Sequence, residues 1–421
     1  MDTKTNTTNN DFDVIVIGGG AAGLMAAGRA AELGKRVLLL EKNPKLGEKL
    51  KISGGGRCNI TNAELDVRAL LPHYGAGEQF LYSAFAEFGV KDTFAFFEKL
   101  GLPLIVEAGK RAFPHTEKAL DVYLALEKYI KQGHVTIKTS SPVTKITKEG
   151  TRITEVCVGK TTYTATSYIF STGGLSHPET GSTGDGFKWL RDLGHNIATP
   201  TPSIVPLLLK ETWSKKLSGV SLDPMRITFF VNGEKKLTKL GKVLFTHFGL
   251  SGPLILNSAQ KVSDLLHVGT VTAEIDIFPN SDIGALDKTL VSVFEKNKNK
   301  QFKTTLKEIV PNGMLAGILA LTEKIIPDDT KVHSIEKEDR KDLVQLLKSL
   351  PLTITGLMGY DKAVVADGGV NLTEIDTRTM RSKKIDNLYI TGDLLHINRP
   401  SGGYSLQLCW TTGYVAGSNA S

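Results

Sequence analysis

VIVIGGGAAG, residues 14–23, joins a short, wholly apolar run of mostly β-branched residues to a cluster of glycines. A run of this kind is typical of a strand buried in a parallel sheet. The alanine-rich segment 21–33 follows, and it predicts a helix that ends at Gly34. Residues 36–40 then return as a second apolar strand. Strand, glycine loop, helix and strand in this order predict a βαβ unit of the Rossmann type.

The glycines of this loop are spaced as G-x-G-x-x-G, and each has a separate task. Gly18 permits the tight turn, Gly20 lets the backbone approach a pyrophosphate, and Gly23 lets helix and strand pack closely. Free N–H groups and the helix dipole favour the phosphates at the helix N-terminus. An acid at the end of the second strand accepts hydrogen bonds from ribose and repels a 2′-phosphate, which favours FAD or NAD over NADP. The expected cofactor-binding residues here are Gly18, Gly20, Ala21, Ala22, Gly23, Glu41 and Lys42.

A second glycine–acid pair follows an apolar run near the C-terminus, in LYITGD at 388–393. In FAD enzymes of this architecture the glycine allows close backbone approach, and the acid reaches the ribityl chain or the phosphates. Alone, Gly-Asp after a strand is common, but paired with the N-terminal motif it favours FAD over NAD. No second G-x-G-x-x-G is present, so a separate nicotinamide domain is not evident. We therefore expect FAD as the cofactor, with Gly392 and Asp393 among its ligands.

Further glycine-rich loops are expected to face the flavin. PSGGY at 400–404 opens an apolar segment and can aim backbone donors at the flavin. SGGGRCN at 53–59 offers three consecutive glycines, which bring backbone against a flat ligand. Loops at 171–174 and 181–186 follow a candidate central strand, where ligands bind in α/β sheets. A plain helix N-terminus is the alternative for 400–404, and ordinary turns are the alternative for 171–174 and 181–186. The expected contacts are Gly54, Gly55, Gly56, Arg57, Cys58, Asn59, Thr172, Gly173, Gly174, Gly184, Asp185, Ser401, Gly402, Gly403, Tyr404 and Ser405.

Two side chains are candidate catalytic proton donors. Cys58 follows the three glycines, and an unperturbed thiol has a pKa of about 8.5. A small buried residue is the alternative for Cys58. If Cys58 is the acid, Cys58→Ala should abolish turnover while FAD stays bound. His247, in THFGLSGP at 246–253, is the second candidate because histidine is the commonest acid–base residue, and a structural histidine is the alternative. For His115 and His396, too, an acid–base role is set against a structural one.

The middle of the chain differs from its two ends. Helices are predicted at 80–100 and 118–132, and short strands between 135 and 171. After the prolines at 200–206, amphipathic strand patterns appear, and a lysine-rich helical region begins at about 282. We therefore expect a disordered tail at 1–10, an FAD-binding domain at 11–198 and 368–421, a β-rich domain at 199–280 and 351–367, and a helical insertion at 281–350.

The composition restricts location and partners. The formal net charge is +7, which suits either a solubility surface or a polyanionic partner such as nucleic acid. Cys58, Cys157 and Cys409 form no CxxC, which argues against disulfides and a zinc site and fits a reducing cytoplasm. The N-terminal residues are polar, and no uninterrupted stretch of 18 apolar residues is present. We therefore expect a cytoplasmic protein with no signal peptide, membrane span or metal.

Taken together, the motifs resemble the YhiN/BaiN-type bacterial flavoproteins, often described as aminoacetone-oxidase-like FAD-binding enzymes. The resemblance runs through nearly the whole chain and is most specific in SGGGRCN and THFGLSGP. It implies an α/β fold, in which a Rossmann-type FAD-binding domain is interrupted by a β-barrel-like domain with a nested helical domain. The family often has Gly-Glu where this chain has Gly392-Asp393, and Asn where it has Ser405. Both changes keep the polarity, so FAD binding is still expected.

The resemblance implies three activities: reduction of a uridine in large-subunit ribosomal RNA to dihydrouridine, oxidation of aminoacetone, and reduction of conjugated steroid double bonds. The net positive charge and the lysine-rich insertion suit contacts with a phosphate backbone. So do four lysines near the glycine loop: Lys42, Lys45, Lys49 and Lys51. We therefore favour the RNA substrate. NADH or NADPH would reduce FAD, and the target base would leave its stack.

Two rival functions stay open. One is an oxidase or reductase of a small molecule, such as an amine or an enone. The other is an RNA-binding assembly factor in which FAD is only structural. The sequence does not choose the electron donor, the acid or the oligomeric state.

Overall fold

The computed structural model describes residues 8–421, which divide into two compact units. The first unit runs to Pro202 and resumes at Ala363–Ser421, and the second is Ser203–Lys362. The sequence placed these junctions at 198/199 and 367/368. They lie elsewhere because β10 (Ile197–Ser203) pairs with β17 (Val365–Val370) in a two-stranded sheet beside the first unit's core.

The start of the chain also differs from the expectation. Residues 8–10 were assigned to a disordered tail, but they belong to β1 (Thr8–Ile17), in which Thr8 pairs with Thr162 of the neighbouring strand. The remainder of the expected tail lies outside the described residues.

Within the described residues, a seven-stranded sheet is the basis of the first unit. Its order is β6-β2-β1-β9-β8-β7, and β18 pairs with β9. The parallel strands are β6 (Thr136–Lys138), β2 (Val37–Leu40), β1, β9 (Thr161–Phe170) and β18 (Leu388–Ile390). The antiparallel strands are β8 (Arg152–Val158) and β7 (Val143–Glu149).

The register of this sheet aligns the last residues of four parallel strands at one edge. Ile17 pairs with both Leu40 and Phe170, and Phe170 pairs with Ile390. The last residues of β1, β2, β9 and β18 therefore lie side by side, although they come from both ends of the chain. The loops that follow these strands leave the sheet at the same edge, which is where α/β sheets bind ligands.

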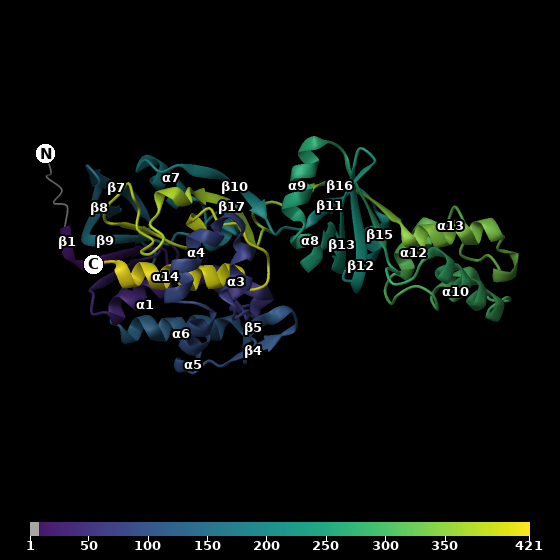
Figure 1. The fold of residues 1–421 in the computed structure, drawn as a ribbon, viewed down its shortest axis with the longest axis horizontal. Helices are drawn as coiled ribbons and strands as arrows, with labels where there is room; N and C mark the ends of the chain where they lie inside the picture. The colour runs from purple at the N-terminus through teal and green to yellow at the C-terminus, as the bar shows by residue number, and fades with distance from the viewer. Residues whose placement is uncertain (1–7) are drawn as a thin grey trace. The chain divides into compact units, whose positions relative to one another are not determined.

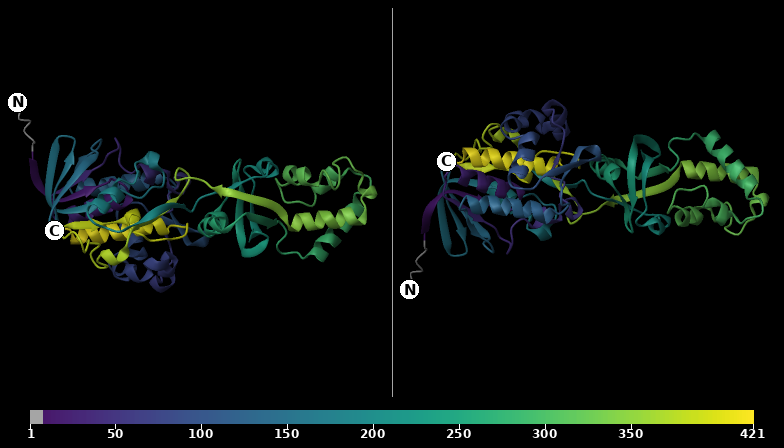
Figure 2. Two further views of the ribbon diagram at one scale, coloured as in Figure 1. Left: turned by 90° about the horizontal axis from the view of Figure 1, so that it is seen from above. Right: turned by 90° about the horizontal axis from the view of Figure 1, so that it is seen from below.

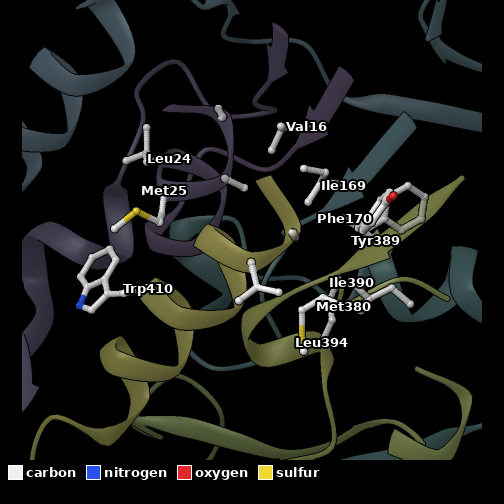
Figure 3. Packing of buried hydrophobic residues seen from close by; sticks show 14 of the residues in the cluster. Val16, Leu24, Met25, Ile169, Phe170, Met380, Tyr389, Ile390, Leu394 and Trp410 are labelled. Carbon is white, nitrogen blue, oxygen red and sulfur yellow. The ribbon is translucent and has the colours of Figure 1, made fainter. Parts of the chain in front are cut away.

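Two long helices, α1 (Ala21–Glu32) and α14 (Tyr404–Asn419), lie side by side in the first unit (Figure 1). Their backbones approach closely because α14 has glycine at the crossing. A Cβ added at Gly413 or Gly417 would lie 2.5 Å from the carbonyl oxygen of Ala22 or Ala26. The core between helices and sheet includes Val16, Met25, Phe170, Ile390 and Trp410 (Figure 3).

Further elements of the first unit are α2 (Glu48–Ile52), α3 (Val67–Leu70), α4 (Glu78–Glu87), α5 (Val90–Lys99), α6 (Ala119–Gln132), α7 (Asp185–Asp192), β3 (Thr61–Asn62), β4 (Leu104–Glu107) and β5 (Arg111–Pro114). The single helix expected at 80–100 is wrong, because the chain extends at Phe88 and a new helix begins after Gly89. The carboxylate of Asp92 caps this start by accepting from the N–H of Gly89 at 2.8 Å.

The second unit, described in full, is a closed barrel with a helical insertion. Its strands in order are β11 (Leu207–Leu209), β14 (Gly249–Ser251), β13 (Glu234–Phe245), β12 (Ser221–Val231), β15 (Val271–Asp276) and β16 (Leu350–Leu357). Its helices are α8 (Pro253–Leu256), α9 (Ala259–Val268), α10 (Ile283–Lys296), α11 (Phe302–Leu306), α12 (Leu315–Thr322) and α13 (Lys337–Lys348). The four helices inserted between β15 and β16 gather at one end of the barrel in both views of Figure 2.

Barrel and inserted helices share one apolar cluster, which contains both Phe245 and Phe302. The predicted fold class, an interrupted Rossmann-type domain with an inserted barrel and a nested helical part, is confirmed. Among the residues that the structure describes, none of the helices has the length and apolarity needed to cross a bilayer.

Candidate cofactor-binding site

The turn after β1 forms an open helix N-terminus. Gly18 has a φ of +106°, and a Cβ there would lie 2.5 Å from the carbonyl oxygen of Ser171. A Cβ at Gly23 would lie 1.9 Å from the carbonyl oxygen of Gly18, so these two glycines are required by packing. A Cβ at Gly20 would meet nothing within 4 Å. Because α1 has neither a side-chain cap nor an acid in its first turn, its N–H groups fit a phosphate.

Glu41, directly after β2, is buried beside this turn. Its Oε2 accepts from the N–H of Gly19 at 2.7 Å, and its Oε1 accepts from the N–H of Asn43 at 2.8 Å. A cavity of about 50 Å³ lies next to Glu41, and residues 141–143 and Thr172 form part of its wall. The Oγ1 of Thr172 is enclosed and has no hydrogen-bond partner among the described residues. Residues 141–143 could not be recognised from the sequence, since a turn before a strand carries no distinguishing signal.

Lys42 connects the loop after β2 to the loop before α7. Its Nζ lies 2.8 Å from Oδ2 of Asp185 and also donates to Thr183. Burial alone would raise the pKa of Asp185, but the bonds from Lys42 and Thr183 hold this pKa below its ordinary value. Two residues expected to bind the cofactor therefore also bind each other.

Asp393 lies between two cations. Arg399 contacts one carboxylate oxygen, and Nζ of Lys49 lies 3.4 Å from the other. Burial opposes ionisation, but the charges of Arg399 and Lys49 hold the pKa of Asp393 below its ordinary value. The side chain of Arg399 is only 2% exposed, and it also donates to Ser405 and to the carbonyl of Ile397. Arg399 could not be recognised from the sequence, because an arginine before PSGGY has no signal until its partner is known.

The loops 53–62 and 400–405 bind each other, although about 340 residues separate them. Nδ2 of Asn62 donates to the carbonyl of Gly402 at 3.2 Å, and the side-chain oxygen of Asn59 accepts from the N–H of Gly403 at 3.0 Å. Gly403 has a φ of +101°, and a Cβ there would lie 2.2 Å from the carbonyl carbon of Thr61. The structure therefore brings together the two glycine loops that the sequence predicted to face one ligand.

Within the first of these loops, Gly54, Gly55 and Gly56 all have positive φ and are exposed. A Cβ at Gly55 or Gly56 would meet nothing within 4 Å, so the backbone there is open to a ligand. Arg57 is engaged differently from the expectation. Its guanidinium contacts Glu107, lies 2.7 Å from Glu117 and sits over the ring of Phe113.

Cys58 is fully buried, with its backbone in the left-handed region at a φ of +60°. Its N–H donates to the carbonyl of Ser53 at 3.0 Å. Burial raises the pKa of the Cys58 thiol to about 12. This environment favours the alternative weighed from the sequence, a small side chain packed in a crowded loop.

The histidine candidates are dispersed. His247 lies in the second unit, at the turn between β13 and β14, and its exposed ring is 4.9 Å from that of Phe248. His115 is exposed, with Nδ1 3.3 Å from the carbonyl oxygen of Pro103. His396 lies in the first unit, three residues after Asp393.

The lysines near the glycine loop do not form a free cationic cluster. Lys42 and Lys49 have the carboxylate partners described above. Lys51 lies 3.2 Å from Glu48 and 4.1 Å from the ring centroid of Tyr123. Three of the four lysines that the sequence suggested for a phosphate backbone therefore have partners within the first unit.

Comparisons with known proteins cover nearly the whole chain. Residues 12–419 match the model of the HI0933-like protein Rossmann domain. The chain is 28% identical over 405 residues to 3-dehydro-bile acid delta(4,6)-reductase of Clostridium scindens, covering 96% of this chain and 97% of that protein. It is 30% identical over 409 residues to ribosomal RNA dihydrouridine synthase of Haemophilus influenzae, covering 95% and 96%.

A solved structure shares the fold at low sequence identity. The 3-ketosteroid-delta4-(5alpha)-dehydrogenase of Rhodococcus jostii RHA1 matches with a TM-score of 0.53 at 13% identity, covering 99% of this chain and 98% of that chain.

Proposed function

Because the chain belongs to the HI0933-like Rossmann family, we propose that it is an FAD-dependent oxidoreductase that reduces a uridine of large-subunit ribosomal RNA to dihydrouridine. The family confirms the resemblance drawn from the sequence and the oxidoreductase class. The substrate part of the proposal rests on the dihydrouridine synthase of Haemophilus influenzae, which aligns with 95% of this chain.

The edge where β1, β2, β9 and β18 end is the observation that carries the FAD proposal. It combines an uncapped helix with open space at Gly20, a buried carboxylate at Glu41 and a second carboxylate at Asp393. These fit a pyrophosphate, a ribose and a ribityl chain in that order. When bound, FAD would supply hydride transfer between NADH or NADPH and the substrate.

The start of α14 supports the same proposal. Gly403 precedes the helix in the left-handed region, and α14 has no side-chain cap and no acid in its first turn. Its N–H groups and helix dipole would stabilise negative charge on the pyrimidine edge of the cofactor. Gly54, Gly55 and Gly56 offer exposed backbone next to this loop. Ser401, Gly402, Gly403, Tyr404 and Ser405 are the residues proposed to hold that edge.

The second unit supports an RNA substrate. Its hairpin strand β13 carries the exposed lysines Lys235, Lys236, Lys239 and Lys242. The helical insertion adds a second exposed group, Lys296, Lys298, Lys300, Lys303 and Lys307. Exposed lysines of this density suit phosphate contacts, whose strength falls steeply with salt. We propose that this unit docks the RNA.

The test is to map dihydrouridine in the ribosomal RNA of cells with and without the gene. Loss of one dihydrouridine from the large-subunit RNA, restored by the intact gene, is the expected result. Purified protein with FAD and NADPH or NADH should then convert that uridine in isolated RNA. Identical RNA from both strains would contradict the substrate proposed here.

A second candidate is the reduction of a conjugated enone in a small molecule. The full-length similarity to the bile acid reductase of Clostridium scindens favours it. This enzyme would oxidise NADPH or NADH with a steroid enone and without RNA. Rapid hydrogen peroxide formation with amino ketones would instead indicate an amine oxidase. RNA binding without any reduction of FAD by NADH or NADPH would indicate an assembly factor.

A further inference from the structure

We propose that His396, paired with Asp367, is the acid that delivers a proton to carbon when this enzyme reduces its substrate. The inference rests on the proposed reduction of a carbon–carbon double bond, and holds for either a uridine or an enone. It replaces Cys58 and His247 as the catalytic acid.

Both residues lie on segments that abut the candidate cofactor site. Asp367 is in β17, and the N–H of His396 donates to the carbonyl of Val370 at 3.1 Å. A Cβ at Gly369 would lie 2.5 Å from the carbonyl oxygen of Leu394, so the two segments are in close backbone contact.

The same segments reach the glycine loop after β9. A Cβ at Gly174 would lie 3.4 Å from the carbonyl oxygen of Asp393 and 3.9 Å from Cβ of Ala366. Gly174 therefore lies against Ala366, the neighbour of Asp367, and against Asp393, three residues before His396.

The pair is a long ion-pair contact between an exposed imidazole and an enclosed carboxylate. Nε2 of His396 lies 3.7 Å from Oδ1 of Asp367. That oxygen is enclosed and has no hydrogen-bond partner among the described residues. The Asp367 side chain is 16% exposed, whereas the His396 ring is 45% exposed. A buried acceptor without a donor is costly, and the imidazolium is the cation placed to compensate it. The open side of the ring can meet a substrate.

Other candidate acids of the first unit do not combine an exposed ring with an enclosed carboxylate that has no hydrogen-bond partner. Cys58 is enclosed. His195 is buried between Glu374 and Ser382, and burial lowers its pKa although Glu374 opposes this. His177 has a carboxylate 2.7 Å from its Nδ1, but that carboxylate, Glu179, is 57% exposed rather than enclosed. His73 is a further rival, because its exposed ring lies 4.9 Å from that of Tyr404. No carboxylate within salt-bridge distance of His73 is found in the described part of the chain.

The chemistry balances with the proposed donor. The double bond gains one hydrogen and two electrons as hydride, supplied ultimately by NADPH or NADH. The second hydrogen arrives as a proton from Nδ1 of His396, because Nε2 faces Asp367. This proton forms the second new C–H bond. The ring is then neutral, and it takes a proton from water through its exposed side. Overall, NADPH, one proton and the unsaturated substrate give NADP⁺ and the saturated product.

The experiment separates the two half-reactions by stopped-flow absorbance of FAD. In His396→Asn, reduction of FAD by NADPH or NADH should stay within about threefold of wild type. The rate of hydride transfer to the RNA uridine or to the steroid enone should fall at least about 100-fold, the usual effect of losing a general acid. Reoxidation by ferricyanide, which needs no proton at carbon, should be unchanged. Asp367→Asn should slow only the substrate step, by about tenfold.

Two histidine variants serve as comparisons. His134→Asn removes an exposed histidine with a φ of +57°, a conformation that asparagine tolerates, and should leave both half-reactions unchanged. His73→Asn tests the rival. If His73→Asn lowers the substrate step and His396→Asn does not, the inference is overturned.

A readout on the cofactor-free protein tests the pair itself. When the His396 ring is neutral, nitrogen–proton correlation spectra should place its proton on Nε2, the nitrogen that faces Asp367. In Asp367→Asn the ring proton should redistribute between Nε2 and Nδ1. The melting temperature should stay within about 2 °C of wild type, since His396 is half-exposed. An unchanged ring spectrum would overturn the role of Asp367. Wild-type protein that reduces neither substrate overturns the proposed function, whereas active wild type with active His396→Asn overturns only this inference.

Discussion

Arg399 and Asp393 form an ion pair in which both side chains are largely enclosed, with exposed fractions of 2% and 12%. The pair connects the strand-end acid to the start of α14, because Arg399 also donates to Oγ of Ser405 at 3.0 Å. It therefore fixes the relative position of two segments that are proposed to hold the ribityl chain and the pyrimidine edge of one cofactor.

Arg399→Ala should destabilise the protein strongly. The change leaves the buried carboxylate of Asp393 with Lys49 alone, and removing one partner of a buried pair costs about 3–5 kcal/mol. Urea unfolding of the cofactor-free protein measures this loss. Lys131→Ala, which breaks an ion pair whose lysine is 63% exposed, should cost less than about 1 kcal/mol. Equal losses of unfolding free energy in Arg399→Ala and Lys131→Ala would contradict a strong stabilising effect of the Arg399–Asp393 pair.

The contribution of Asp393 to the free energy of unfolding should decrease as the pH falls. Its pKa is lower in the folded protein than the unfolded value of about 3.9, so its ionisation stabilises the fold above that pH. The stabilisation is lost as the pH falls below 3.9 through the folded pKa. The difference in unfolding free energy between wild type and Arg399→Ala should therefore narrow in acid. A difference that grows below pH 4 would contradict this account.

Gly20→Ala and Gly23→Ala should have contrasting effects. A Cβ at Gly20 meets no protein atom within 4 Å, so the fold should survive at a cost below about 1 kcal/mol. Its methyl group would instead occupy the space proposed for the pyrophosphate, and FAD affinity should fall at least tenfold. Flavin fluorescence titration and urea unfolding measure the two effects.

In Gly23→Ala the added carbon would lie 1.9 Å from the carbonyl oxygen of Gly18, so the turn itself must shift. We expect stability and FAD binding to be lost together. FAD binding by Gly20→Ala at wild-type affinity would place the pyrophosphate elsewhere.

Cys58→Ala should retain turnover, contrary to the expectation from the sequence. The thiol is fully buried and its pKa is raised to about 12, so a packing role is favoured over proton donation. The variant should lose about 1–2 kcal/mol of stability from the small cavity, with kcat within about threefold of wild type. Loss of turnover with FAD still bound would restore Cys58 as the acid and count against His396.

Charge reversal on the helical insertion should weaken RNA binding alone. In a triple variant with Lys298, Lys303 and Lys307 each changed to Glu, affinity for ribosomal RNA should fall and its salt dependence should become shallower. Reduction of FAD by NADPH or NADH and turnover of any small enone should be unaffected. Wild-type RNA affinity in this variant would remove the insertion from the proposed interface.

Local patterns were sufficient for the elements whose signal is contained in a few residues. The apolar run 14–17, the glycine spacing and the alanine-rich helix predicted β1, the turn and α1, because burial and backbone freedom act within that stretch. The same reasoning failed at 80–100. There both segments have helical periodicity, and the break depends on one glycine and its cap from Asp92.

By itself the sequence determined the Rossmann-type unit, the interruption by a β-rich part and helices, and the identity of the glycine loops, since each is encoded in local composition and spacing. The barrel was expected only from the family resemblance. Only the tertiary structure decided which charges are free and which are already engaged. Lys42, Lys49 and Arg57 looked like anion ligands, but carboxylates distant in the chain lie against them. Arg399 and the pair of Asp367 with His396 became candidates only through contacts. The reason is physical: burial and ion pairing depend on which segments the sheet edge brings together, and strand register rather than local sequence sets that edge.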